Sequence, residues 1–248
     1  MLKNNTFTLG TIRIDFFSNK HKFAFTLAEV LITLGIIGVV AALTLPTVIN
    51  KYQKKTAATR AKKAYTEMMQ AIKLSEVENG PISEWSYPAT NSIANTRNFI
   101  TTYIEPYFKD LKYCSGGKSN TKCGLVVSAY GANYILPNGT GVSMLVSTNS
   151  DLYVLFDING PKKPNLMGTD AFYFITYKGK LMPYGWYDGI SRQDVFNSFR
   201  YTEKLSGKAL TLRCNNMKID SSNTDLNRHG CTALLMLDGW EMRADYPY

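Results

Sequence analysis

Histidine and cysteine are scarce in this chain of 248 residues, which contains two His and four Cys. This supply is too small for a His-based metal centre, and the cysteines lack the C-x-x-C spacing of zinc ribbons and dithiol oxidoreductases. Eighteen Gly and nine Pro are too few for a collagen-like or low-complexity chain. Sixteen Tyr and 12 Phe favour burial over disorder. The length therefore predicts one or two folded domains with a sizeable core.

No arrangement of residues stands out as catalytic. The sequence shows no Ser-His-Asp, Cys-His or paired-carboxylate pattern of the kind that nucleophilic or acid–base catalysis needs. One histidine, His21, lies near the N-terminus, and we expect the other, His229, to be a solvated loop residue. The sequence therefore favours a structural or binding protein over an enzyme.

Charge is almost absent between Phe25 and Leu45, where Glu29 is the only charged residue. A helix of this length spans roughly 30 Å at about 1.5 Å per residue, which matches the hydrocarbon core of a bilayer. The mean hydropathy of -0.17 excludes a polytopic membrane protein but allows one span. No A-x-A site follows the apolar run, which argues against a cleaved secretory signal peptide.

The junction before the apolar run carries a recognisable signal. Residues 22–29 read KFAFTLAE, with a small residue just before the run and one carboxylate inside it. This pattern resembles the prepilin signal of type IV pilins and type II secretion pseudopilins. In that family a membrane peptidase cuts on the cytoplasmic side before a Phe and methylates the new amino terminus. The resemblance implies a cut between Ala24 and Phe25, followed by N-methylation of Phe25.

The resemblance also implies roles for two residues after the cut. Glu29, fifth in the mature chain, would pair in a filament with the amino terminus of a neighbouring subunit, and Pro46 would kink the helix. A charge in lipid costs on the order of 3 kcal/mol, so Glu29 needs a partner there. The alternative is that Glu29 lies near the interface and reaches water or headgroups.

The basic residues that flank the apolar run conflict with the orientation that this signal requires. Those before it are Arg13, Lys20 and Lys22, and those after it are Lys51, Lys54, Lys55, Arg60, Lys62 and Lys63. The positive-inside rule alone would put the large domain in the cytoplasm. Because the prepilin signal requires a cytoplasmic leader, we expect a single-pass protein of the inner membrane. Its C-terminal domain would lie in the periplasm or, within a filament, at the cell surface.

The pattern after Pro46 predicts that the helix continues into an α+β domain. Small or apolar residues recur at helical spacing at positions Ala57, Ala61, Ala64, Met68, Ile72 and Ser75. A stop signal follows at residues 79–81 (NGP). Aromatic and β-branched runs predict strands over 132–136, 142–148, 152–158 and 171–178, with short helices over 97–111 and 231–237.

The fold class that we predict is a pilin-like α+β fold. A long kinked N-terminal helix, whose first half spans the membrane, packs on a small antiparallel β-sheet domain. The expected segments are a cytoplasmic leader (1–24), a transmembrane and assembly helix (25–49), its amphipathic continuation (50–79) and an exported β-rich domain (80–248).

The four cysteines allow three disulfide connectivities, and their spacing does not choose among them rigorously. Local pairing, Cys114 with Cys123 and Cys214 with Cys231, closes the shortest loops and is the pairing that we expect. Paired cysteines imply an oxidising compartment, such as the periplasm or the cell exterior.

One loop has the residue types of a cation site. Its oxygen side chains are those of Asp157, Asn159, Asn165 and Asp170. Such a set could surround Ca²⁺, and the resemblance adds that some secretion pseudopilins bind calcium near this part of the fold. However, only two of the four side chains are carboxylates, and Lys162 and Lys163 would oppose a cation. The same residue types serve plain turns, which is the interpretation that we favour, and we expect no other cofactor.

The sequence thus predicts a pilin-like structural subunit that is assembled into a type IV pilus or a type II secretion pseudopilus. The implied partners are other pilin subunits, the prepilin peptidase, an inner-membrane assembly platform and membrane lipid. One alternative is a DNA-binding minor pilin. The net charge falls from +9 to +6 when the leader is removed, which is modest, and anionic headgroups explain residues 51–63 equally well. Another alternative is a membrane-anchored exported enzyme that uses the leader for sorting.

Overall fold

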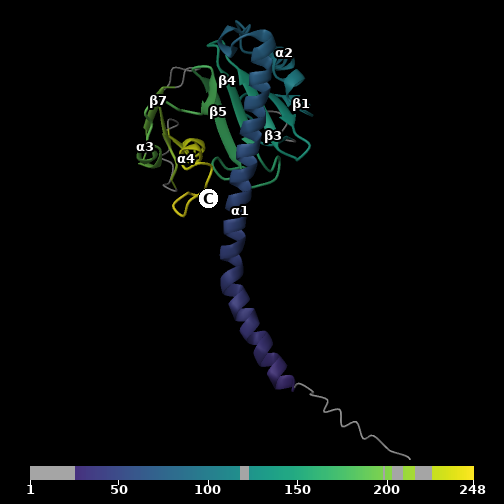
Figure 1. Ribbon diagram of the computed structural model, residues 1–248, viewed down its shortest axis with the longest axis vertical. Helices are drawn as coiled ribbons and strands as arrows, with labels where there is room; N and C mark the ends of the chain where they lie inside the picture. The colour runs from purple at the N-terminus through teal and green to yellow at the C-terminus, as the bar shows by residue number, and fades with distance from the viewer. Residues whose placement is uncertain (1–25, 118–122, 198, 203–208, 216–224) are drawn as a thin grey trace, which may run out of the picture. The chain divides into compact units, whose positions relative to one another are not determined.

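The computed structural model describes residues 26–117, 123–197, 199–202, 209–215 and 225–248 (Figure 1). The chain divides into two compact units, Met1–Thr47 and Val48–Tyr248. The leader and the expected cut between Ala24 and Phe25 lie outside the described residues.

Helix α1 begins at Leu27, continues through Pro46 and ends at Asn79. It ends there because Gly80 adopts a left-handed conformation (φ +75°), which terminates helices, and because a proline follows. The structure confirms one long helix with the expected stop signal. The kink at Pro46 stays a prediction.

The C-terminal part of α1 packs on the sheet through small side chains. Its buried residues are Ala57, Ala58, Ala61, Ala64, Met68, Ala71, Ile72 and Ser75, which include all six positions of the predicted stripe. Alanines let the helix axis approach the strands closely. Tyr65 flanks the stripe, donating a hydrogen bond from its hydroxyl to the Leu181 carbonyl (3.2 Å) and packing its ring against Phe174 (5.3 Å between centroids).

The sheet beneath α1 is an antiparallel meander of six strands in sequence order. The strands are β1 (Lys112–Gly116), β2 (Ala132–Ile135), β3 (Gly141–Val146), β4 (Leu152–Asp157), β5 (Ala171–Tyr177) and β6 (Lys180–Pro183). The four predicted strands correspond to β2–β5. The two edge strands, β1 and β6, were not predicted.

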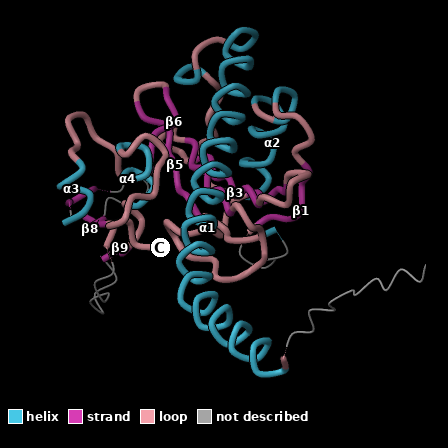
Figure 2. The backbone as a smooth tube through the Cα atoms, turned by 60° about the horizontal axis from the view of Figure 1, so that its bottom comes forward, coloured by secondary structure: helices cyan, strands magenta, loops and turns pink. Residues whose placement is uncertain are grey.

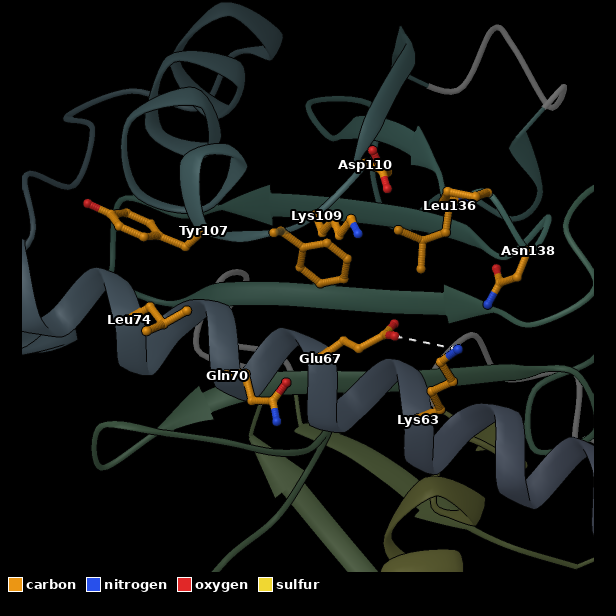
Figure 3. Close-up of a pocket in the computed structure, with 11 residues that line it drawn as sticks. Lys63, Glu67, Gln70, Leu74, Tyr107, Lys109, Asp110, Leu136 and Asn138 are labelled. Atoms are coloured by element: carbon orange, nitrogen blue, oxygen red, sulfur yellow. Dashed lines mark ion pairs between the residues drawn. The ribbon is translucent and has the colours of Figure 1, made fainter.

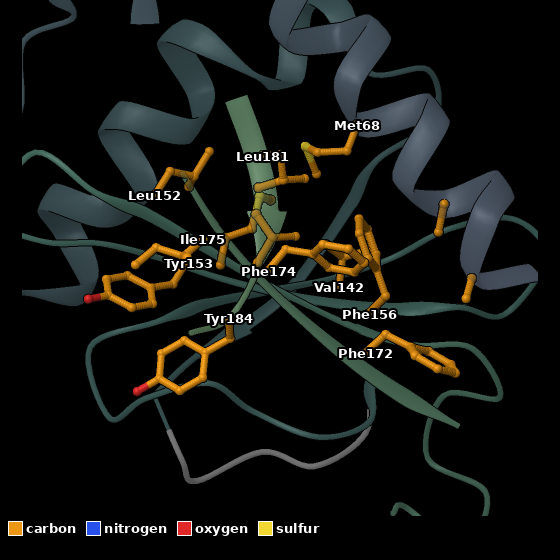
Figure 4. Packing of buried hydrophobic residues seen from close by; sticks show 14 of the residues in the cluster. Met68, Val142, Leu152, Tyr153, Phe156, Phe172, Phe174, Ile175, Leu181 and Tyr184 are labelled. Atoms are coloured by element: carbon orange, nitrogen blue, oxygen red, sulfur yellow. The ribbon is translucent and has the colours of Figure 1, made fainter. Parts of the chain in front are cut away.

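The core fills both faces of the central strands. On the face toward α1, Met68, Phe156, Phe174 and Leu181 pack together (Figure 4). The opposite face is covered by the segment after Cys123. There the Leu125 N–H donates to Asp157 on β4 (2.8 Å), and the Val127 N–H donates to Ser143 on β3 (2.9 Å). Because both faces are covered, every residue of β3 and β4 is buried.

Smaller elements lie at the two sides of the sheet (Figures 1 and 2). On the β1 side are α2 (Ile93–Tyr103) and η2 (Glu105–Tyr107), whereas η1 (Ile82–Glu84) follows α1 and has Ile82 near Gly179 in the turn between β5 and β6. Beyond β5 and β6 are α3 (Arg192–Asn197), β7 (Phe199–Thr202), β8 (Ala209–Arg213), β9 (Asp225–Asn227) and α4 (Cys231–Leu237). The β7–β8 pair is antiparallel and the β8–β9 pair parallel. Among these elements, only α4 was predicted with the bounds that the structure shows.

The helix expected over residues 97–111 is displaced toward the N-terminus. Ser92 caps α2, since its hydroxyl accepts a hydrogen bond from the Asn95 N–H (3.0 Å), and this cap sets the start at Ile93. The helix ends at Tyr103 because Pro106 lacks the N–H that another turn would need. A short η2 turn follows instead.

Both disulfides join cysteines that are close in the sequence. Cys114 on β1 is bonded to Cys123, which anchors the segment that covers the second face of the sheet. Cys214, just after β8, is bonded to Cys231 at the start of α4. This is the local pairing that the sequence favoured.

Candidate functional site

The N-terminus of α1 contains a capping box made by Thr26 and Glu29. The Thr26 backbone N–H and hydroxyl each donate a hydrogen bond to the Glu29 carboxylate, both at 2.8 Å. In return, the Glu29 N–H donates to the Thr26 hydroxyl oxygen (3.2 Å). This reciprocal arrangement satisfies N–H groups that a helix start leaves unpaired. Glu29 therefore has polar partners within its own chain.

The apolar surface of α1 between Leu27 and Ile49 is open along its length. Leu31, Ile37 and Leu43 are between 61% and 75% exposed. A continuous apolar surface of this kind on a protein marks contact with lipid or with other protein chains. Among the helices that the structure describes, α1 is the one long and apolar enough to cross a membrane. This surface anchors the protein in a membrane.

A groove of about 380 Å³ lies between α1 and the segment that joins η2 to β1 (Figure 3). Lys63 and Glu67 of α1 form an ion pair in it (3.7 Å), and Tyr107 and Asp110 line its other wall. None of its lining residues is a serine, cysteine or histidine. The lining therefore offers no Ser-His or Cys-His pairing.

His229 differs from the solvated loop residue that the sequence suggested. It is only partly exposed, and its ring lies edge-on to Tyr184, with 6.4 Å between centroids. The packing of β6 against the segment before α4 brings the two rings together. This aromatic contact is structural.

Asp170 holds together the loop between β4 and β5, which has the residue types of a cation site. Its carboxylate accepts hydrogen bonds from the backbone N–H groups of Asn165 (2.8 Å) and Leu166 (2.6 Å) and from the Asn159 side-chain amide (3.0 Å). Asn165 adopts a left-handed conformation (φ +53°), which asparagine tolerates well. These contacts are those of a plain turn.

The remaining oxygens of this loop fit a hard cation only in part. One side-chain oxygen each of Asp157, Asn159 and Asn165 is buried without a hydrogen-bond partner, as expected where water or an ion binds. However, both oxygens of Asp170 already accept hydrogen bonds. Within the described segments no three His, Cys, Asp or Glu side chains gather as metal ligands. The structural turn therefore stays the interpretation that we favour, and the calcium site stays the alternative to it.

Asp157 is expected to make stability depend on pH. Its side chain is fully buried, and this burial raises its pKa to about 7. Between about pH 4 and pH 7 the folded chain therefore holds a proton that the unfolded chain releases, so stability falls as pH rises through this window. Asp157→Asn removes the effect. We expect the difference in unfolding free energy, variant minus wild type, to increase by about 3 kcal/mol from pH 5 to pH 8.

Chemical denaturation of both proteins at the two pH values measures this difference. If the difference in unfolding free energy between the two proteins is the same at pH 5 and pH 8, the pKa of Asp157 is not raised. Repeating the pH 8 measurement with millimolar Ca²⁺ tests the cation site, because calcium bound to the ionised carboxylate would stabilise wild type and not the variant. We expect no such stabilisation.

Two sequence families match this chain in adjacent segments. Residues 19–45 match the prokaryotic N-terminal methylation motif, which is the signal of type IV pilins and pseudopilins. These are structural proteins that are processed by the prepilin peptidase and assemble with other pilin subunits. Residues 47–248 match a family of unknown function, DUF6613. Searches of curated proteins and of solved structures found no match. The chain therefore belongs to the DUF6613 family and carries a type IV pilin-like methylation signal at its N-terminus.

Proposed function

We propose that this protein is a pilin-like structural subunit that polymerises through the first half of α1 into a type IV pilus or a type II secretion pseudopilus. One observation carries the proposal. The methylation motif leads directly into a continuous helix with an open apolar surface, on which Glu29 is the only charge up to Leu45. A helix with these properties can leave lipid only for an equally apolar environment, such as the core of a filament.

The orientation belongs to the same proposal. The N-terminus lies in the cytoplasm, where the peptidase cuts between Ala24 and Phe25, and residues 48–248 lie on the other side of the inner membrane. The two disulfides support this orientation, because such bonds persist in oxidising compartments. The role is structural and needs no catalytic site.

The mature N-terminus tests this proposal. Mass spectrometry of the membrane fraction should find a chain that begins at N-methylated Phe25. Ala24→Leu is the matched control, since the signal requires a small residue before the cut, and this variant should keep its leader. An intact Met1 in the wild-type protein, or a cut near Pro46, would contradict the proposal.

A further inference from the structure

A second cleft, of about 340 Å³, lies between α1 and the loop that joins β4 to β5. Tyr52, Thr56 and Arg60 of α1 line one wall, and Lys163 of the loop lines the other. Tyr248 closes one end. The cleft lies entirely within the second unit, so α1 and the loop hold its walls in a fixed arrangement.

The cleft contains positive charge without a matching carboxylate. Arg60 donates one long hydrogen bond, from Nη1 to the Ile158 carbonyl (3.5 Å). In the described part of the chain, neither Arg60 nor Lys163 makes an ion pair. The one carboxylate in the lining, Asp170, is engaged by loop N–H groups. Most of the guanidinium and ammonium donors are therefore available to an anion.

The position of the cleft along α1 brings it close to a bilayer surface. Tyr52 is seven residues after Leu45, the last residue of the apolar run. On a continuous helix this separation is about 10 Å, and the headgroup layer extends several ångströms beyond the hydrocarbon core. Lys54, which lies between Tyr52 and Thr56 on α1, donates to the Tyr246 carbonyl (3.3 Å) and lies over the Tyr248 ring (5.8 Å from its centroid). Tyrosines beside lysines are typical of this depth.

The loop itself presents the side chains of an interfacial segment. Lys162 and Lys163 are exposed, and Leu166, three residues further on, is 45% exposed. The Asp170 hydrogen bonds to the N–H groups of Asn165 and Leu166 fix this turn. A rigid turn with basic residues and an exposed apolar side chain suits an anionic lipid surface.

We propose that the cleft between Arg60 and Lys163 binds the phosphate headgroup of an acidic phospholipid while the subunit is anchored and not yet assembled. The guanidinium and ammonium groups contact the phosphate oxygens, a pairing that arginine in particular favours. The Tyr52 and Tyr248 rings flank the glycerol portion. This inference rests on the membrane anchoring in the proposed function but not on filament assembly.

Lipid binding to the full mature subunit tests the inference. The subunit is purified in a maltoside detergent and titrated with phosphatidylglycerol or phosphatidylcholine, and bound lipid is counted by native mass spectrometry. A charge-assisted hydrogen bond to a phosphate contributes about fivefold or more in affinity. The double substitution Arg60→Gln with Lys163→Gln should therefore weaken phosphatidylglycerol binding roughly 30-fold. Phosphatidylcholine should bind the wild-type protein more weakly than phosphatidylglycerol does.

The matched control is Lys62→Gln with Lys162→Gln. It removes two charges from the same helix and loop, at positions outside the cleft. Because these charges would make no direct contact with the phosphate and act only through screened solvent, their loss should cost fivefold or less. Equal losses in the two double variants would overturn the inference, because they would indicate general surface attraction. Equal binding of the two lipids, or full competition by millimolar inorganic phosphate, would also overturn it.

Hydrogen exchange of the wild-type subunit gives an independent result that needs no variant. In phosphatidylglycerol nanodiscs the amides of residues 158–170 should exchange more slowly than in phosphatidylcholine nanodiscs. Equal exchange rates of these amides in the two kinds of nanodisc would overturn lipid binding in the cleft. If the lipid tests fail, mass spectrometry should still find the N-methylated Phe25 terminus. A failure of this inference is therefore distinguishable from a failure of the proposed function.

Discussion

Glu29→Gln subunits are expected to be inserted into the membrane and cut normally but to be missing from filaments. The substitution keeps the size of the side chain and an oxygen that can accept the hydrogen bonds from Thr26, so the start of α1 should survive. Insertion should be unchanged or easier, because a charge in lipid is unfavourable. In the filament, however, the amino terminus of the neighbouring subunit would lose its partner. An uncompensated buried charge costs about 3 kcal/mol or more, so incorporation should fall about a hundredfold.

Co-expression of the tagged variant with wild type, followed by shearing of filaments from the cells, measures this incorporation. Thr26→Val is the control, since it removes the cap hydroxyl but keeps the Glu29 charge. Losing a cap costs about 1 kcal/mol, so this variant should show the smaller defect. If Glu29→Gln enters filaments as efficiently as wild type, the proposed role of Glu29 is wrong.

Removing the disulfide near the C-terminus is expected to destabilise the domain more than removing the other one. Cys214 and Cys231 are both fully buried, and their bond fixes the start of α4 to the end of β8. Replacing both with alanine should cost about 3–5 kcal/mol, which lowers the melting temperature of a domain of this size by about 10 °C.

The bond between Cys114 and Cys123 provides the comparison. It closes a separation of 9 residues rather than 17, and loop entropy alone separates the two bonds by only about 0.5 kcal/mol. Burial therefore decides the order, because Cys114 is partly exposed on an edge strand. Thermal melting of the two double-alanine variants shows which bond matters more. If replacing Cys114 and Cys123 lowers the melting temperature as much as or more than replacing Cys214 and Cys231, this reasoning is wrong.

Sequence patterns predicted the elements whose own residues determine them. The stripe from Ala57 to Ser75 has strict helical spacing, and each of its positions is buried. Strands β2–β5 are rich in aromatic and β-branched residues, so their positions were also predictable. Edge strands β1 and β6 are short and begin with lysine, and β1 ends in glycine. These strands form because a neighbour offers hydrogen bonds, which local sequence does not reveal.

The two candidate sites also differ in whether local sequence is sufficient to predict them. The capping box of Thr26 and Glu29 follows the T-x-x-E pattern, so local sequence is sufficient to predict it. The cleft between Arg60 and Lys163 was not readable. About a hundred residues separate its two walls in the chain, and only the packing of the β4–β5 loop on α1 brings them together.

The continuity of α1 has a mechanical consequence. In the proposed filament, a pull would act on each subunit through α1 and reach the sheet as a shear force along the packed stripe. Alanine side chains offer little resistance to sliding, because they do not interlock with the strands. Resistance must come from larger side chains, which are Met68 and Ile72 in the stripe and Tyr65 beside it. The Tyr65 hydroxyl donates a hydrogen bond to a β6 carbonyl. These three side chains would set the load at which the helix slides out of the domain.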